Sequence, residues 1–218
     1  NHIETYLDQT DEIFESLQRE KFSPSGRVRY AMPASCLMTP HFTQLLERQP
    51  DFPQIDLDVT ICHSDEVIQL LTANKIDFGF VTKRFESPDL HLTEFAHEEY
   101  VLVGSDAKDL KFSEAADLLH KKFISYPGMN ELYDLWFESA FGKRKAIHFD
   151  QLRISGNINN LPGAITMARH GLGIGVFPRH CVYKELTQKQ LSAHTVKNRE
   201  TALYPIYLAR HRQARPLR

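Results

Sequence analysis

The feature that most constrains the fold is a β-α-β-α-β order of sequence patterns that occurs twice along the chain. In the first half, apolar and polar residues alternate strictly at 55–61, and shorter strands are predicted at 28–32 and 78–81. Helical spacing of apolar residues separates these strands at 42–49 and 67–71. Strands joined through helices give a mostly parallel sheet. The first half is therefore expected to form one α/β unit.

The second half repeats this order with an offset of about 95 residues and little sequence identity. Strands are predicted at 123–126, 147–154 and 174–177, and helices at 132–142 and 161–170. Since the order of elements is kept while the residues are not, the repeat is one of architecture. We expect two α/β lobes.

Two further apolar strands, at 100–104 and 205–209, lie outside the repeats. The first leaves the first lobe for the second, and the other follows a polar stretch at 186–201. A chain with two such crossing strands is expected to form two lobes with a cleft between them. Ligands of such sheets bind outside the carboxyl ends of the strands.

Residues 2–21 have the apolar spacing of one helix, which the sequence Ser-Pro-Ser-Gly at 23–26 ends. This helix either packs on its own domain or dimerises and extends toward an upstream segment; its 3.5-residue spacing favours dimerisation. The predicted boundaries are a linker or dimerisation helix at 1–23, lobe I at 27–99 with 204–218, and lobe II at 100–203.

Charge and cysteine content exclude several classes of protein. The chain has 26 Lys and Arg against 28 Asp and Glu, whereas domains that bind nucleic acid usually carry a basic excess. Three cysteines without a CxxC pair predict neither a disulfide framework nor a zinc ribbon.

No apolar run approaches the length of a membrane span, and no apolar leader opens the chain, so we expect a cytoplasmic protein. The missing initiator Met indicates a segment of a longer protein.

The sequence predicts no cofactor, no metal and no enzymatic activity. The glycines of Gly171-Leu-Gly-Ile-Gly175 follow a helix and open a strand, the reverse of a dinucleotide-binding loop, so they are interpreted as a helix end and a close-packed turn. The 11 histidines fall on different elements without an HExxH pair. Cys36 is a redox sensor or nucleophile only if its thiolate is stabilised, and otherwise an inert thiol. No GxSxG, SxxK or paired carboxylates are present.

Small polar residues gather where the predicted strands end and helices begin. Ser35, Ser64 and Asn160 are each candidates for helix N-caps. Such turns also direct the N–H groups of helix N-termini at one place, which favours an anion.

Several segments carry a family resemblance. They are RVRYAMPAS from residue 27, the PQIDL strand from 53, DFGFV from 77, EYVLVGS from 99 and ARHGLGIGVFP from 168. Over roughly residues 1–210 the sequence resembles the C-terminal effector-binding domain of LysR-type transcriptional regulators, with part of their linker helix. It departs from the family in a shorter turn after the first strand and in Cys62-His63, where a Gly is usual.

The resemblance implies a two-lobed fold like the type 2 periplasmic binding proteins, with two mixed, mostly parallel sheets joined by two crossing strands and preceded by the linker helix. It implies a small-molecule effector in the cleft and an upstream winged helix-turn-helix for promoter DNA. It also implies a homodimer, and a tetramer at full length, with no membrane partner. The expected dimer surface comprises the helix 42–49, the strand 55–61 and the helix 161–170.

Carried over by position, the expected ligand contacts are Ser35, Cys36, His63 and Thr82 in lobe I, and Tyr126, Asn157, Asn159 and Asn160 in lobe II. No acidic residue is among them, so a small anion is the expected ligand, with a neutral effector or one stacked near Tyr126 as the alternative.

Three functions remain in view. The first is a regulatory domain that senses an effector, the second a soluble solute-binding protein of the same fold, and the third an enzyme, which the lack of a catalytic constellation disfavours. A helix-turn-helix within about 70 residues upstream would favour the first.

Overall fold

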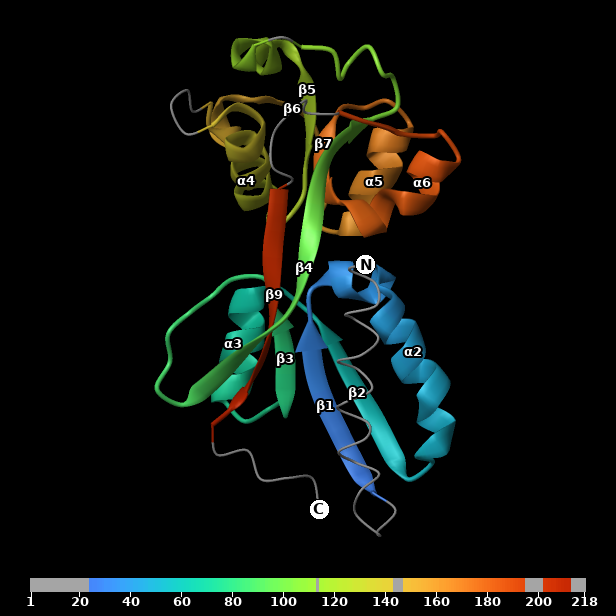
Figure 1. Ribbon diagram of the computed structural model, residues 1–218, viewed down its shortest axis with the longest axis vertical. Helices are drawn as coiled ribbons and strands as arrows, with labels where there is room; N and C mark the ends of the chain where they lie inside the picture. Colours follow the sequence, from blue (N-terminus) through green and yellow to red (C-terminus); the bar gives the residue numbers. More distant parts are fainter. Residues whose placement is uncertain (1–23, 113, 143–146, 195–201, 213–218) are drawn as a thin grey trace. The chain divides into compact units, whose positions relative to one another are not determined.

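The computed structural model describes residues 24–112, 114–142, 147–194 and 202–212 (Figure 1). The contacts divide the chain into two units: unit 1 ends at His97 and resumes at Pro205, and unit 2 covers Glu98–Tyr204. The chain passes between them twice, in β4 (Leu90–Gly104) and β9 (Ala202–His211). The linker helix predicted at 2–21 lies outside the described residues.

Unit 1 has the predicted β-α-β-α-β order. Besides parts of β4 and β9, its elements are β1 (Gly26–Met32), the 3₁₀ helix η1 (Ala34–Met38), α2 (Pro40–Arg48), η2 (Gln49–Asp51), β2 (Ile55–Ile61), α3 (Ser64–Thr72) and β3 (Phe78–Val81). Strand β1 pairs in parallel with both β2 and β3, and β9 pairs antiparallel with β3. The strand order β2-β1-β3-β9-β4 places β2 at the edge of the sheet.

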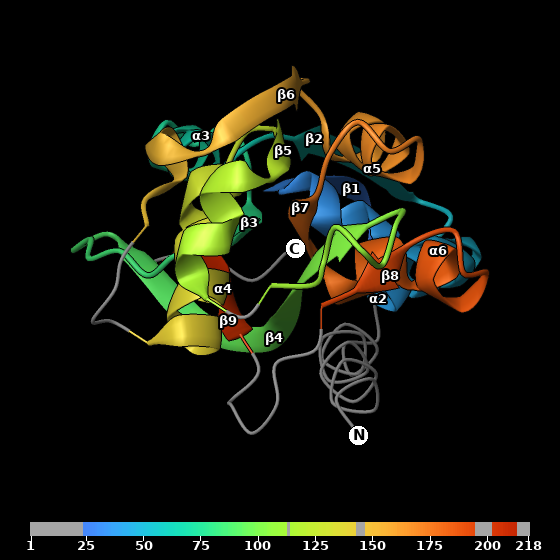
Figure 2. The same ribbon diagram turned by 90° about the horizontal axis from the view of Figure 1, so that it is seen from above.

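Helices α2 and α3 cover opposite faces of this sheet (Figures 1 and 2). Alternation along β1 sends Tyr30 and Met32 into an apolar cluster against which residues of α2 pack, and Ala31 into the cluster that contains residues of α3. The sheet is therefore buried on both sides, as expected for parallel strands joined by helices.

The ends of both helices follow from their sequences. Pro40 opens α2, where the missing N–H costs nothing because the first helical N–H groups have no partner inside the helix. Ala73 is the C-cap of α3, and Asn74 follows it with a left-handed φ of 54°, a conformation that Asn accepts at a helix end more readily than most residues.

Unit 2 contains the second set of elements. They are η3 (Ala115–His120), β5 (Lys122–Ser125), α4 (Met129–Phe141), η4 (Phe149–Gln151), β6 (Arg153–Asn157), α5 (Leu161–Arg169), β7 (Gly175–Pro178), η5 (Arg179–Val182), α6 (Tyr183–Thr187) and β8 (Ser192–Ala193). Strands β5 and β6 are parallel, whereas β7 and β8 pair antiparallel with β4. Figure 1 shows α4 on one side of these strands and α5 with α6 on the other.

The glycines at 171–175 act as predicted. Gly171, with a φ of 77°, follows α5, and Gly175 opens β7. A Cβ on Gly173 would lie 2.6 Å from the carbonyl oxygen of Lys122, so only glycine fits this close-packed turn.

The strand predicted at 147–154 is wrong in its first part. The segment forms η4, because the side chain of Gln151 accepts the N–H of His148 at 2.9 Å and closes a capped turn. Strand β6 begins only at Arg153. The strand predicted at 100–104 is longer than expected, since β4 already begins at Leu90.

None of the helices formed by the described residues has the length and apolar character needed to cross a membrane.

Candidate functional site

The candidate ligand-binding residues of unit 1 all lie at the carboxyl-terminal end of its parallel strands. Strands β1, β2 and β3 are parallel, so their carboxyl ends meet, and the N–H of Cys62 donates to the carbonyl of Met32 at 3.1 Å. The candidates that follow these three ends are Ser35 and Cys36 after β1, His63 after β2 and Thr82 after β3.

Ser64 joins two of these strand ends. Its hydroxyl oxygen accepts the N–H of Thr82 at 3.0 Å and shares a hydrogen bond of 3.1 Å with the Thr82 hydroxyl. Ser64 is the first residue of α3 and is buried, while His63 occupies the N-cap position and is exposed. The expectation that Ser64 caps α3 is therefore wrong, because its hydroxyl holds the end of β3 instead.

Ser35 and Cys36 lie in η1 and are buried, with 8% and 1% of their surface exposed. Ser35 is not an N-cap either, since Pro33 holds that position. Cys36 belongs to the apolar cluster of Tyr30 and Met32, and its carbonyl accepts the hydroxyl of Thr39 at 2.6 Å. The side chain of Cys36 thus packs in the core of unit 1.

Leu37 and Met38, in the same 3₁₀ helix, are 38% and 42% exposed. They give this strand end an apolar surface that the sequence analysis missed. The only sequence feature that could have indicated this surface is the position of both residues in the turn after the first strand.

Charges near α3 partly cancel. Asp65 and Glu66 stand in its first turn, where carboxylates are favourable for the helix but unfavourable for a bound anion. Lys83, directly after Thr82, pairs with Asp65 at 2.5 Å. Burial, and then the nearby Glu66 carboxylate, raise the pKa of the Cys62 thiol to about 11, so this thiol stays protonated at neutral pH.

The unit 2 asparagines also gather at strand ends. Ser125, the last residue of β5, is paired with Asn157, the last residue of β6. The candidates Asn157, Asn159 and Asn160 are exposed and follow one another into α5. Asn160 is the predicted N-cap: its side-chain oxygen accepts the N–H of Gly163 at 2.8 Å, and its amide donates to Asn159 at 3.3 Å.

Tyr126 is turned into the interior of unit 2. Its hydroxyl donates to the carbonyl of Val176 at 2.7 Å, and its ring stacks on Phe177 with centroids 5.3 Å apart. Burial, followed by the nearby Cys181 and Glu98, raises its pKa well above the ordinary value. These contacts give Tyr126 a packing role.

The structure thus groups the candidates into two sets, one at the strand ends of each unit. Among the described residues there is no cluster of three or more His, Cys, Asp and Glu suited to a metal ion. Hydroxyl, amide and backbone N–H groups dominate both sets, and these groups can bind a polar molecule through hydrogen bonds.

Two α/β units linked by two crossing strands, with polar residues at the strand ends, define a domain of the type 2 periplasmic-binding-protein class. The sequence matches the LysR substrate binding domain family over residues 23–218, and the chain belongs to that family. A search of the curated proteins gave no match.

Solved structures agree on the fold. The regulatory domain of CrgA, a LysR-type transcriptional regulator from Neisseria meningitidis, is 11% identical, with a TM-score of 0.70 over 87% of this chain and 90% of that chain. The reduced form of the OxyR2 regulatory domain from Vibrio vulnificus is 16% identical, with a TM-score of 0.67 over 89% and 90%. The effector-binding domain of QuiR in complex with shikimate is 14% identical, with a TM-score of 0.64 over 87% and 88%.

Proposed function

We propose that this effector-binding domain senses a small anionic molecule, a carboxylate or an oxyanion, through the strand-end residues of both units. In this proposal, binding of the ligand changes the geometry of an oligomer and thereby DNA binding by an upstream domain. The role is sensing, with no catalytic step.

The observation that carries the proposal is the start of α5. Three asparagines precede the helix, and no acidic residue stands in its first turn. The partial positive charge of a helix N-terminus favours an anion, and the asparagine amides offer hydrogen-bond donors.

Unit 1 supports the same ligand class less strongly. The hydroxyls of Ser64 and Thr82 are fixed against each other beside the start of α3. Lys83 offsets the charge of Asp65, although Glu66 leaves a carboxylate in the same turn. The exposed Leu37 and Met38 suit an effector with an apolar part. QuiR, a protein of the same fold, has been solved with shikimate bound.

The test is a calorimetric screen of small metabolic anions, amines and neutral compounds against the wild type and two Asn160 variants. Asn160→Ser keeps a capping oxygen, whereas Asn160→Asp keeps the cap and adds a negative charge. We expect anions to bind the wild type, and Asn160→Asp to weaken them by about tenfold or more, which corresponds to about 1.4 kcal/mol. Asn160→Ser should bind more tightly than Asn160→Asp, and both should unfold at nearly the same urea concentration as the wild type.

Two variants locate the ligand more closely. Ser35→Ala and Asn157→Ala should each weaken binding by about 1–3 kcal/mol through lost hydrogen bonds. Binding restricted to cationic compounds would contradict the proposal, as would anion binding that is indifferent to all of these substitutions.

We further propose that two copies associate through α2 and β2 of one and the α5 region of the other. Strand β2 is an edge strand, and Leu46 on α2 and Ile61 on β2 are 49% and 42% exposed. Next to α5 in unit 2, Ile154 on β6 and Leu172 after α5 are each 41% exposed, whereas Leu161 and Ile165 of α5 itself are buried.

Sedimentation velocity at micromolar concentration should show a dimer, and Leu46→Glu should shift it toward the monomer. A wild-type protein that sediments only as a species of 25.2 kDa would contradict the proposed dimer.

Residues 1–218 alone should bind DNA weakly and without sequence preference, because the proposed DNA-binding domain lies upstream. A nanomolar complex of these residues with operator DNA at physiological salt would contradict this expectation.

A further inference from the structure

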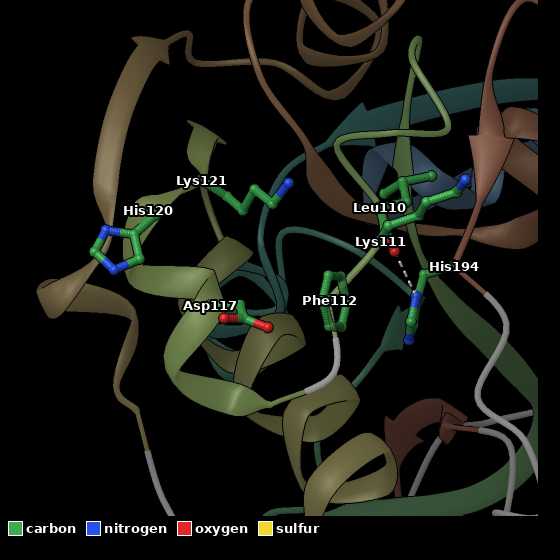
Figure 3. Close-up of a pocket in the computed structure, with 7 residues that line it drawn as sticks. All are labelled: Leu110, Lys111, Phe112, Asp117, His120, Lys121 and His194. Carbon is green, nitrogen blue, oxygen red and sulfur yellow. Dashed lines mark hydrogen bonds between the residues drawn. The ribbon is translucent and has the colours of Figure 1, made fainter.

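A surface pocket of about 640 Å³ lies in unit 2, and none of its lining residues is a strand-end candidate. Its volume is in the range of small-molecule sites. The segment after β4, the helix η3 with the residue after it, and the residue after β8 build the pocket (Figure 3). The lining residues are Leu110, Lys111, Phe112, Asp117, His120, Lys121 and His194.

One wall of the pocket is aromatic and held in place. The rings of Phe112 and His194 stack with centroids 4.1 Å apart, and the ring of Trp136 meets both edge-on. Nδ1 of His194 donates to the carbonyl of Leu110 at 3.0 Å, so this nitrogen carries the proton of the neutral ring. Burial lowers the pKa of His194 despite this hydrogen bond, which keeps the imidazole uncharged at neutral pH. The wall therefore offers a ligand a neutral, flat surface.

Two opposite charges border the rest of the pocket. Figure 3 shows Lys121 extending from directly after η3 toward the segment 110–112. Its ammonium donates to the carbonyl of Lys108 at 3.4 Å. Asp117 turns its carboxylate toward the Phe112 side, where one oxygen accepts the N–H of Glu114 at 3.2 Å. Lys111 and His120 lie at the outer edges, with their polar ends directed away from this pair (Figure 3).

We propose that this pocket is a second ligand site, which takes a small zwitterion of the α-amino acid class. The ammonium of Lys121 binds the ligand carboxylate, the carboxylate of Asp117 accepts from the ligand ammonium, and the ligand side chain lies against Phe112 and His194. A simple anion would meet the repulsion of Asp117, and a simple amine that of Lys121. Only a molecule that carries both charges is attracted by both residues.

This site is separate from the proposed effector position in its residues and in its ligand class. An amino acid could thus modulate the domain while the anionic effector occupies the strand ends. Failure of one proposal leaves the other intact, because Asn157 and Asn160 report on the strand ends, and Lys121 and Asp117 report on the pocket.

The probe is L-phenylalanine, added to the ¹⁵N-labelled domain and followed by NMR. Millimolar probe should shift the signals of Phe112, Asp117, Lys121 and His194. Two matched compounds test the need for both charges: 3-phenylpropionate lacks the ammonium, and 2-phenylethylamine lacks the carboxylate. Each should bind at least about tenfold more weakly than L-phenylalanine. Equal binding of either compound would overturn the zwitterion assignment.

Variants locate the site. Lys121→Met and Asp117→Asn should each raise the dissociation constant of L-phenylalanine by about tenfold or more. Asparagine keeps an oxygen for the Glu114 N–H, so Asp117→Asn removes the charge without removing the helix cap. Lys108→Met and Asp109→Asn remove like charges from neighbouring exposed residues and should leave binding unchanged.

Three results would overturn the second site. They are an absence of shifts at about 10 mM probe, shifts confined to unit 1, and an equal effect of the Lys108 and Lys121 substitutions. Asn157→Ala should leave the shifts in place, since it alters only the strand-end position.

Discussion

The hydroxyl of Tyr100 donates a hydrogen bond of 2.6 Å to Oε2 of Glu98, and both residues are buried in unit 2. Oε1 of Glu98 lies 3.7 Å from Nε2 of His180, and Arg179 pairs with Glu99 at 2.7 Å. The contacts of His180 and Arg179 attach η5 to Glu98 and Glu99, the first two residues of β4 in unit 2. A buried carboxyl group at such a point needs partners, because an unpaired one is costly to bury.

Replacing Tyr100 by phenylalanine should therefore destabilise the domain. Tyr100→Phe removes a donor from a buried carboxyl group and should lower the free energy of unfolding by about 1–3 kcal/mol. Urea unfolding followed by circular dichroism measures the change. Tyr183→Phe removes a hydroxyl from a tyrosine that is 67% exposed, and this control should change stability by less than about 0.5 kcal/mol. Equal effects of the two substitutions would contradict this account of Glu98.

The Ser64–Thr82 contact predicts a second loss of stability. Ser64→Ala leaves the N–H of Thr82 without its acceptor, which should cost about 1–2 kcal/mol of unfolding free energy. The control is Ser87→Ala, because the Ser87 hydroxyl accepts only a long, exposed hydrogen bond of 3.4 Å from Asp89. Hydrogen exchange should show faster exchange at Thr82 in Ser64→Ala alone. Unchanged exchange there would exclude the proposed fixing of the β3 end.

The pair of Arg29 and Asp77 makes stability depend on acid pH. Burial raises the pKa of the Asp77 carboxyl, but the hydrogen bonds and positive charge of Arg29 outweigh it, so the net pKa in the folded state is lowered. The unfolded carboxyl titrates near pH 3.9. A lowered folded pKa gives stability that is full above that value and is lost as the pH falls through the folded pKa.

Asp77→Asn should accordingly cost about 1 kcal/mol at pH 7 and progressively less as the pH falls below the unfolded value of about 3.9, as measured by urea unfolding from neutral to acid pH. Asp56→Asn, which changes an exposed carboxylate of β2, should leave the wild-type pH dependence in place. A loss for Asp77→Asn that is the same at every pH would rule out the ion pair as its cause.

The thiols should react slowly in the folded domain. The thiolate is the reactive form, and the raised pKa of Cys62 keeps it scarce, while Cys36 and Cys181 are each 1% exposed. Iodoacetamide at pH 8 should modify the native protein at least about tenfold more slowly than the urea-unfolded protein. Mass spectrometry of Cys62→Ser identifies which thiol reacts. Rapid modification of Cys36 in the native domain would favour the redox-sensor interpretation.

Elements with a strict pattern could be predicted from the sequence. The alternation of Ile55–Ile61 predicted β2, because a strand buried mainly on one face alternates apolar and polar residues. Gly171 predicted the end of α5, because a left-handed backbone favours glycine. Strand β4 was found only from 100 onward, since its earlier residues include exposed polar side chains such as His91 and Glu94. The turn at 149–151 depends on one side-chain hydrogen bond, which periodicity does not report.

The site was less accessible to such reasoning. That polar residues follow strand ends could be predicted, because connection order fixes which ends meet. The direction in which each of these side chains points could not be predicted from the sequence. Ser64 turns to β3 instead of capping its helix, and Tyr126 packs on Phe177. The aromatic pocket wall joins Phe112 to His194 across 82 positions of sequence, a pairing that no local pattern encodes.

The position of β9 has a consequence for synthesis of the chain. Strand β9 lies between β3 and β4 in the strand order, yet it follows all of unit 2 in the sequence. Unit 2 is continuous, so it can fold as soon as its last residues leave the ribosome. The sheet of unit 1 cannot be completed in the same way, because one edge of β3 stays unpaired until β9 has been synthesised. During that interval it exposes an apolar edge to other chains, and chaperone protection of nascent protein matters most at this stage.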